Sequence, residues 1–150
     1  DHHFPLDTND VVTAWIPAQP IPLEMGPLSF AYPLDVHKLV NAVTFEKTGT
    51  GYDRRVSEVF LKNNVSVNET PFELGEVSFH HNLNFHTASS NRTNRSRVAL
   101  ANTYYRDGAR VVHAPTMVSG DWQKFMPNVK PGDIAASPLN PICWPVKNKP

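Results

Sequence analysis

The sequence has little of what a disulfide-stabilised, membrane-spanning or strongly charged protein requires. Its 150 residues include one cysteine, Cys143, which excludes an internal disulfide and any zinc site built on cysteine pairs. No apolar run reaches the roughly 18–20 residues of a membrane helix, and no signal peptide is visible. Fourteen basic residues balance fourteen acidic ones, so net charge favours neither nucleic acid nor an anionic membrane as a partner. We therefore expect a cytoplasmic protein without nucleic-acid or membrane partners, and the oligomeric state stays open.

Glycine is scarce relative to proline, with seven glycines against fourteen prolines. Prolines end helices and interrupt inner strands, and here they are spread along the chain, which excludes a bundle of long helices. We predict one short helix over 54–62 and another near 120–126. Residues 36–47 are ambiguous between helix and strand, and 48–53 read as a lid or connection.

Short β-like segments dominate the rest of the chain. β-Branched and aromatic residues predict strands over 11–16 and around 28–34. Val77, Phe79, Leu83 and Phe85 keep one parity, which predicts a strand pair facing a core, and 97–105 alternates in the same way. Residues 109–115 are expected to add an edge strand. The pattern predicts an all-β sandwich or barrel, with a core over 1–114 and a proline-rich tail packed on it over 115–150.

The most informative stretch is NLNFHTASSNRTNRSRVALANTYY, residues 82–105. His86 is expected to end one strand and Arg97, eleven residues later, to open the next. If these strands pair antiparallel, both side chains lie near one end of a sheet. An inward histidine is a good metal ligand and an arginine binds a carboxylate, although a surface histidine and a solvated arginine explain the spacing as well. His80 and His81 are assigned to the turn between strands, with at least one of them exposed.

Several separate motifs, taken in order over residues 1–105, resemble the phytanoyl-CoA hydroxylase family of Fe(II)- and 2-oxoglutarate-dependent dioxygenases. Asp1 stands where that family has the aspartate of a W-H-x-D motif, followed by a strand like VVTAWI and a segment like EMGPLSFAYPL. GEVSFHH, LNFH and SSNRTNRSRVAL then stand where the family has a run ending in histidine and a loop before an arginine strand.

The resemblance implies a double-stranded β-helix (jelly-roll, cupin-like) core, truncated at its N-terminus, with minor helices. It implies Fe(II), 2-oxoglutarate as cosubstrate and O₂, with ascorbate in support. Asp1 and His86 would be metal ligands, Arg97 would clamp the far carboxylate of 2-oxoglutarate, and Trp15 would lie near the cosubstrate. Some family members have a serine where this chain has Ala88, so Thr87 or Ser89 would have to replace that contact.

The resemblance also implies that the chain begins inside the metal motif, with the first histidine two positions before Asp1. We expect neither His2 nor His3 to be a native ligand. The implied activity is hydroxylation or a related oxidation of a small organic substrate, with decarboxylation of 2-oxoglutarate to succinate. Because Asp1 is present, halogenation is disfavoured. Two alternatives stay open: a cupin-type metal enzyme that does not use 2-oxoglutarate, and a non-catalytic family member or inactive fragment.

Overall fold

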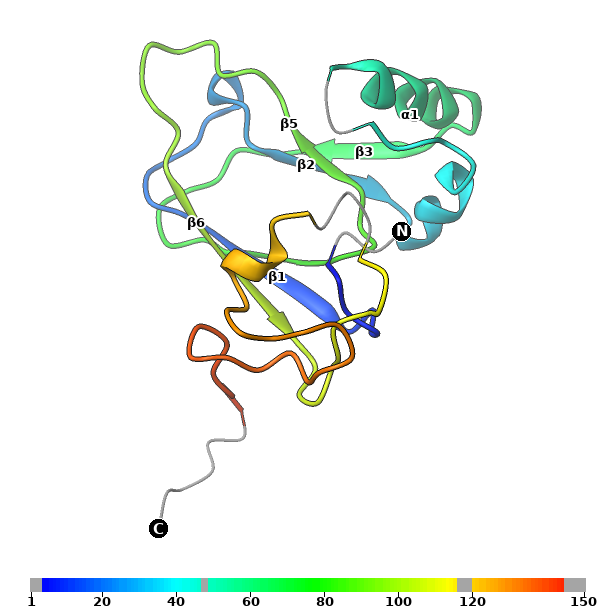
Figure 1. Cartoon of the computed structure of the whole chain (residues 1–150). Helices are drawn as coiled ribbons and strands as arrows, with labels where there is room; N and C mark the ends of the chain where they lie inside the picture. The colour runs from blue at the N-terminus through cyan, green and yellow to red at the C-terminus, as the bar shows by residue number, and fades with distance from the viewer. Residues whose placement is uncertain (1–3, 47–48, 116–119, 145–150) are drawn as a thin grey trace. The chain divides into compact units, whose positions relative to one another are not determined.

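The computed structural model describes residues 4–46, 49–115 and 120–144 (Figure 1). The strands are β1 (Val11–Pro17), β2 (Leu28–Tyr32), β3 (Ser66–Glu69), β4 (Ser78–His81), β5 (His86–Ala88) and β6 (Ala99–Tyr105). The helices are α1 (Gly51–Lys62) and the 3₁₀ helices η1 (Leu23–Met25), η2 (Leu34–Val40) and η4 (Trp122–Lys124). Among the described residues no helix has the length and apolar character needed to cross a bilayer.

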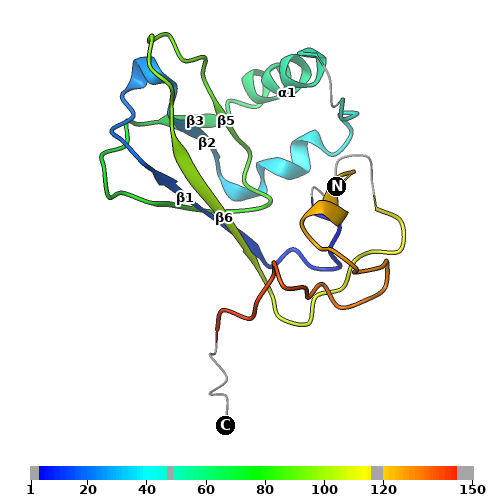
Figure 2. The same cartoon turned by 60° about the vertical axis from the view of Figure 1, so that its left-hand side comes forward.

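The strands form two three-stranded sheets, ordered β4-β1-β6 and β3-β2-β5. Figures 1 and 2 label all of these strands except β4. β1 pairs antiparallel with β4, and β2 pairs antiparallel with both β3 and β5. The expectation of a mostly β fold with few helices is therefore confirmed. The predicted strands over 11–16 and 28–34 are present, and the helix predicted over 54–62 is present as α1.

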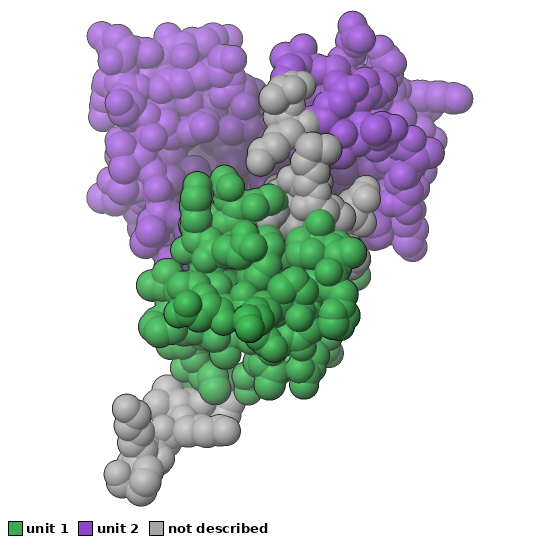
Figure 3. Space-filling model, viewed as in Figure 1, with its two compact units in different colours: residues 1–11, 105–150 green, residues 12–104 purple. Residues whose placement is uncertain are grey.

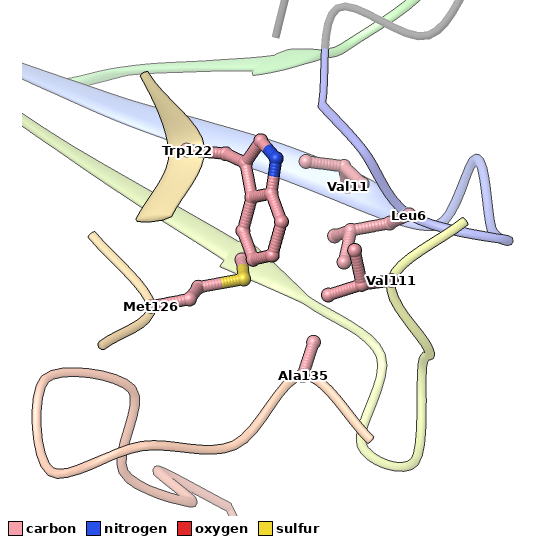
Figure 4. Close-up of a cluster of buried hydrophobic side chains, with 6 residues drawn as sticks. All are labelled: Leu6, Val11, Val111, Trp122, Met126 and Ala135. Atoms are coloured by element: carbon pink, nitrogen blue, oxygen red, sulfur yellow. The ribbon is translucent and has the colours of Figure 1, made fainter. Parts of the chain in front are cut away.

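The chain divides into two compact units, which Figure 3 colours separately. Unit 1 holds residues 1–11 and 105–150, and unit 2 holds residues 12–104. The core of unit 1 is a cluster of buried apolar side chains shown in Figure 4: Leu6, Val11, Val111, Trp122, Met126 and Ala135. The Tyr105 hydroxyl donates a hydrogen bond to the Ala135 carbonyl at 2.6 Å, which ties β6 to the later chain. The predicted boundary at residue 114 stays a prediction.

Unit 2 contains both sheets apart from two terminal strand residues, and its core lies where their inner faces meet. Ile21, Met25 and Phe72 are buried there, with Trp15, Leu28 and Phe30 packed against them. Trp15 comes from β1 and Phe30 from β2, so this cluster joins the two sheets. Several residues of the candidate functional site described below lie on these inner faces.

The parity prediction for β4 is wrong. The side chain of Phe79 is 67% exposed and Val77 is also exposed, whereas His80 is buried. The inner face of this strand carries the polar residues, and the apolar residues lie on the outer face. His80 and His81 also belong to β4 itself, not to a turn.

Other local predictions need smaller corrections. Residues 109–115 form isolated bridges, Leu6 to Val111 and Arg110 to Ile134, in place of an edge strand. Of the ambiguous segment 36–47, residues 36–40 belong to the 3₁₀ helix η2, and the last residues of the predicted lid, 51–53, begin α1. The predicted tail helix is reduced to the three residues of η4.

Candidate functional site

His86 is the first residue of β5, where it lies directly opposite Phe30 of β2. Partners in an antiparallel pair project from the same face, so the imidazole lies on the same face as the Phe30 ring, and His86 itself is exposed. The His86 Nδ1 is 2.9 Å from the Asn84 carbonyl oxygen. Because a carbonyl only accepts, Nδ1 carries the proton and Nε2 keeps a free lone pair. This is the tautomer in which histidine ligates a metal through Nε2.

His80 faces His86 from the other sheet. It lies opposite Thr13 in the β1–β4 pair, and its side chain is only 8% exposed. The two imidazole centroids are 4.5 Å apart, and Phe30 lies 5.3 Å from His80. Burial, and then the neighbouring His86, lower the pKa of His80 from 6.5 to about 4. His80 is therefore neutral at physiological pH.

Three buried side-chain atoms in the described part of the chain lack a hydrogen-bond partner, and all three lie close to His86 in sequence. They are the Nδ1 of His80 and the Oδ1 atoms of Asn82 and Asn84. An unpaired buried polar atom costs free energy, so such atoms are rare in folded proteins. These three are concentrated at the end of β4 and in the turn that follows it.

Arg97 lies two residues before β6, and its position is set by three hydrogen bonds. The Gln19 amide donates to the Ser96 carbonyl at 2.9 Å, and the Ala18 N–H donates to the Val98 carbonyl at 3.0 Å. The Arg97 guanidinium itself donates to the Gly26 carbonyl. Two flanking carbonyls and one side-chain contact thus hold the arginine in place.

Gly26 is the residue that allows this approach. Its φ of +71° lies in the left-handed region that favours glycine. A side chain at Gly26 would overlap the Ser89 carbonyl and would lie 3.4 Å from the Arg97 guanidinium. The turn after η1 therefore packs directly against the segment that follows β5.

His86 and Arg97 both contact residues 26–30, which comprise the turn after η1 and the start of β2, although their own strands belong to different sheets. β5 pairs with β2, and β6 pairs with β1, so the expected antiparallel pairing of their two strands is wrong. The loop between them crosses from one sheet to the other. His86 lies opposite Phe30, and Arg97 binds Gly26, four residues earlier.

Trp15 packs against the core cluster of unit 2, and its expected place near the cosubstrate stays a prediction. Its ring makes an edge contact with Phe72, with centroids 5.0 Å apart. Ala88 lies opposite Leu28. Of its two neighbours, Ser89 donates its hydroxyl hydrogen bond to the Glu69 carboxylate at 3.0 Å.

The predicted carboxylate ligand, Asp1, lies outside the described residues, as do His2 and His3. Within residues 4–46, 49–115 and 120–144, no three histidine, cysteine or acidic side chains are grouped as a metal would need. A hollow of about 700 Å³ lies beside α1, lined by Glu46, Arg55 and Val59 among others, and none of the predicted site residues lines it.

Sequence reasoning missed three residues of this site. They are Gly26, Gln19 and His80, of which the sequence analysis considers only His80 and assigns it to a turn. The period-two alternation of VSFHH contained the signal for His80, because it puts His80 on the face opposite to Phe79.

No protein-family model matches the chain, and no curated protein does. Solved structures do resemble it. The non-heme alpha-ketoglutarate-dependent carbocyclase SnoK of nogalamycin biosynthesis is 24% identical, with a TM-score of 0.66 over 91% of this chain and 50% of SnoK. The epimerase SnoN of the same biosynthesis is 18% identical, with a TM-score of 0.62 over 91% of this chain and 49% of SnoN. The epimerase has also been solved with Fe³⁺, alpha-ketoglutarate and nogalamycin RO, at 20% identity and a TM-score of 0.63. The chain spans about half the length of these structures and shares its fold with that part of them.

Proposed function

We propose that this chain is the metal- and cosubstrate-binding part of an Fe(II)- and 2-oxoglutarate-dependent oxygenase that oxidises a small organic molecule. The observation that carries the proposal is the arrangement around β2 and the turn that precedes it. A histidine in the ligating tautomer lies opposite Phe30, and an arginine lies about four residues away at Gly26. The shared fold with two alpha-ketoglutarate-dependent enzymes supports it.

The described residues fit such a pair of ligands. The Nδ1 proton of His86 is tied to the Asn84 carbonyl, which leaves Nε2 available to an ion. The guanidinium of Arg97 spends one donor on Gly26, and its remaining N–H groups are available to a carboxylate. The unpaired polar atoms at residues 80–84 lie beside the same histidine. We propose Asp1 as the carboxylate ligand, with the first histidine of the motif two positions before it.

Bound there, iron and 2-oxoglutarate would supply the oxidising chemistry, in which O₂ is consumed and the 2-oxo acid becomes succinate and carbon dioxide. The protein's own residues bind and orient. His86 would hold the ion through Nε2, and Arg97 would pair with the distal carboxylate and so orient the diacid. Trp15 and Phe30 form an apolar wall that limits water near the reacting centre.

We further propose the jelly-roll topology, since two sheets in the orders β4-β1-β6 and β3-β2-β5 are six strands of such a double sheet. The motif order favours the phytanoyl-CoA hydroxylase family within this class. Because the similar structures include a carbocyclase and an epimerase, the reaction is proposed as an oxidation that includes hydroxylation and related outcomes.

The test is conversion of 2-oxoglutarate to succinate by the full-length gene product with Fe(II), ascorbate and O₂. We expect succinate from the wild type and from His37→Ala, which alters a histidine outside the site. We expect none above background from His86→Ala. Succinate formation that persists in His86→Ala would overturn the metal assignment, and its absence from the folded wild type would overturn the proposed function.

A further inference from the structure

His80 occupies a place in the fold where a buried apolar residue would be expected. It lies on the inner face of β4, enclosed by the rings of Phe30 and His86 from the opposite sheet. Its side chain is buried, and its Nδ1 has no hydrogen-bond partner. A phenylalanine would fill this space without an unpaired nitrogen, so packing alone does not explain a histidine.

The position of the unpaired nitrogen indicates which tautomer is present. An orphaned buried N–H is rarer in proteins than an orphaned acceptor. The Nδ1 of His80 is therefore the bare acceptor, and the proton lies on Nε2. Nε2 is the ring nitrogen farther from the backbone, so this N–H lies on the part of the ring that extends from β4 toward the second sheet.

His80 belongs to a polar row that crosses the inner face of its sheet. Its register partner in β1 is Thr13. The Thr13 and Thr103 hydroxyl oxygens are 3.0 Å apart, which links β1 to β6. One of these two hydroxyls donates to the other, and the acceptor keeps its own O–H free for a ligand. Three adjacent strands thus present hydrogen-bonding groups on the side that faces His86.

We propose that His80 is a ligand-binding residue of the site at His86, donating a hydrogen bond from its imidazole to a carboxylate oxygen of the small organic acid bound there. This rests on the proposed function, because 2-oxoglutarate is the acid expected beside His86. The row formed by His80, Thr13 and Thr103 then binds the end of the acid nearest the ion, while Arg97 binds the other end.

The experiment measures 2-oxoglutarate binding by calorimetry under anaerobic conditions in the Fe(II)-loaded, full-length gene product. Wild type is compared with His80→Phe, which keeps a flat ring between Phe30 and His86, and with His80→Gln, which keeps a donor. Each variant is also titrated with Fe(II) alone. We expect His80→Phe to weaken 2-oxoglutarate binding at least tenfold with unchanged Fe(II) affinity, and His80→Gln to restore part of the loss.

A second readout separates binding from structure. Because His80→Phe removes an unpaired buried nitrogen, its melting temperature should equal or exceed that of the wild type. ¹⁵N spectra of the wild-type histidine rings should show a proton on Nε2 of His80 that shifts when 2-oxoglutarate is added.

The outcomes are distinct. If wild type and His80→Phe bind 2-oxoglutarate equally, this inference is overturned while the proposed function stands. If His80→Phe loses Fe(II) affinity, His80 is a metal ligand and not a hydrogen-bond donor to the acid, and the inference is overturned. If the wild type binds Fe(II) but no 2-oxoglutarate, the proposed function itself fails, and the inference fails with it.

Discussion

Replacing Gly26 with alanine should disconnect Arg97 from the site. At a φ of +71°, any side chain pays about 1–2 kcal/mol for the left-handed backbone. The new Cβ would also lie 2.8 Å from the Ser89 carbonyl carbon and overlap its oxygen, and relieving such an overlap costs about 1–3 kcal/mol. The two terms together predict a loss of about 2–5 kcal/mol in the free energy of unfolding.

The matched control is Gly108→Ala. Gly108 has a similar φ of +79°, but no heavy atom lies within 4 Å of where its Cβ would be. It should therefore lose only the backbone term of about 1–2 kcal/mol. Urea denaturation of both variants measures the difference. Gly26→Ala should also weaken 2-oxoglutarate binding, because the carbonyl that anchors Arg97 moves with the turn, whereas Gly108→Ala should not. Equal losses of stability in the two variants, together with unchanged binding, would refute this account of the turn.

Three further predictions concern the buried His80, the hydrogen bond that positions Arg97, and the faces of β4. Because burial lowers the pKa of His80 from 6.5 to about 4, the unfolded chain binds more protons between these values. The free energy of unfolding of the metal-free protein should therefore be greatest above pH 6.5 and should decrease as the pH falls toward 4. In His80→Phe, denaturation measured across this pH range should show a smaller decrease. Gln19→Ala removes the hydrogen bond to the Ser96 carbonyl, beside Arg97. Calorimetry should show that 2-oxoglutarate binding weakens severalfold, while the free energy of unfolding falls by only about 1 kcal/mol. Unchanged affinity would contradict a positioning role for Gln19. Because Phe79 is exposed, Phe79→Thr should change the free energy of unfolding by less than ~0.5 kcal/mol, whereas Ile21→Ala in the core should lower it by about 2–5 kcal/mol. A larger loss in Phe79→Thr than in Ile21→Ala would support the prediction from the sequence that Phe79 faces the core.

Local chemistry explains which elements could be predicted from the sequence. β1 is predictable because VVTAWI combines β-branched and aromatic residues, and α1 because Val56, Val59 and Phe60 follow helical spacing. The turn at Gly26 is predictable for the same reason, since glycine accepts a positive φ. Each of these rests on interactions within a few residues of chain.

The faces of β4 could not be predicted by the usual rule. That rule puts the apolar side of an alternating strand in the core, and it assigned Val77 and Phe79 to the interior. In this fold the inner face carries His80, and the outer face carries the apolar residues. Local patterns fail most often at functional sites, where polar groups are kept inside at a cost in stability.

The relation between His86 and Arg97 was only half predictable. The spacing of eleven residues predicts that both serve one site, but spacing does not encode which sheet a strand joins. In the structure His86 pairs with Phe30 of β2, and the Arg97 side chain binds the Gly26 carbonyl in the turn just before β2. Asp1 lies outside the described residues, so its place in the site stays a prediction.

The central claim is that the guanidinium of Arg97 binds the far carboxylate of a diacid whose other end lies at His86. It is tested most directly by titrating 2-oxoglutarate into the Fe(II)-loaded, full-length gene product and into its Arg97→Gln variant, with Arg95→Gln from the neighbouring loop as control. We predict binding in wild type and Arg95→Gln, and a loss of at least tenfold in Arg97→Gln. Equal affinity in all three proteins would contradict the account.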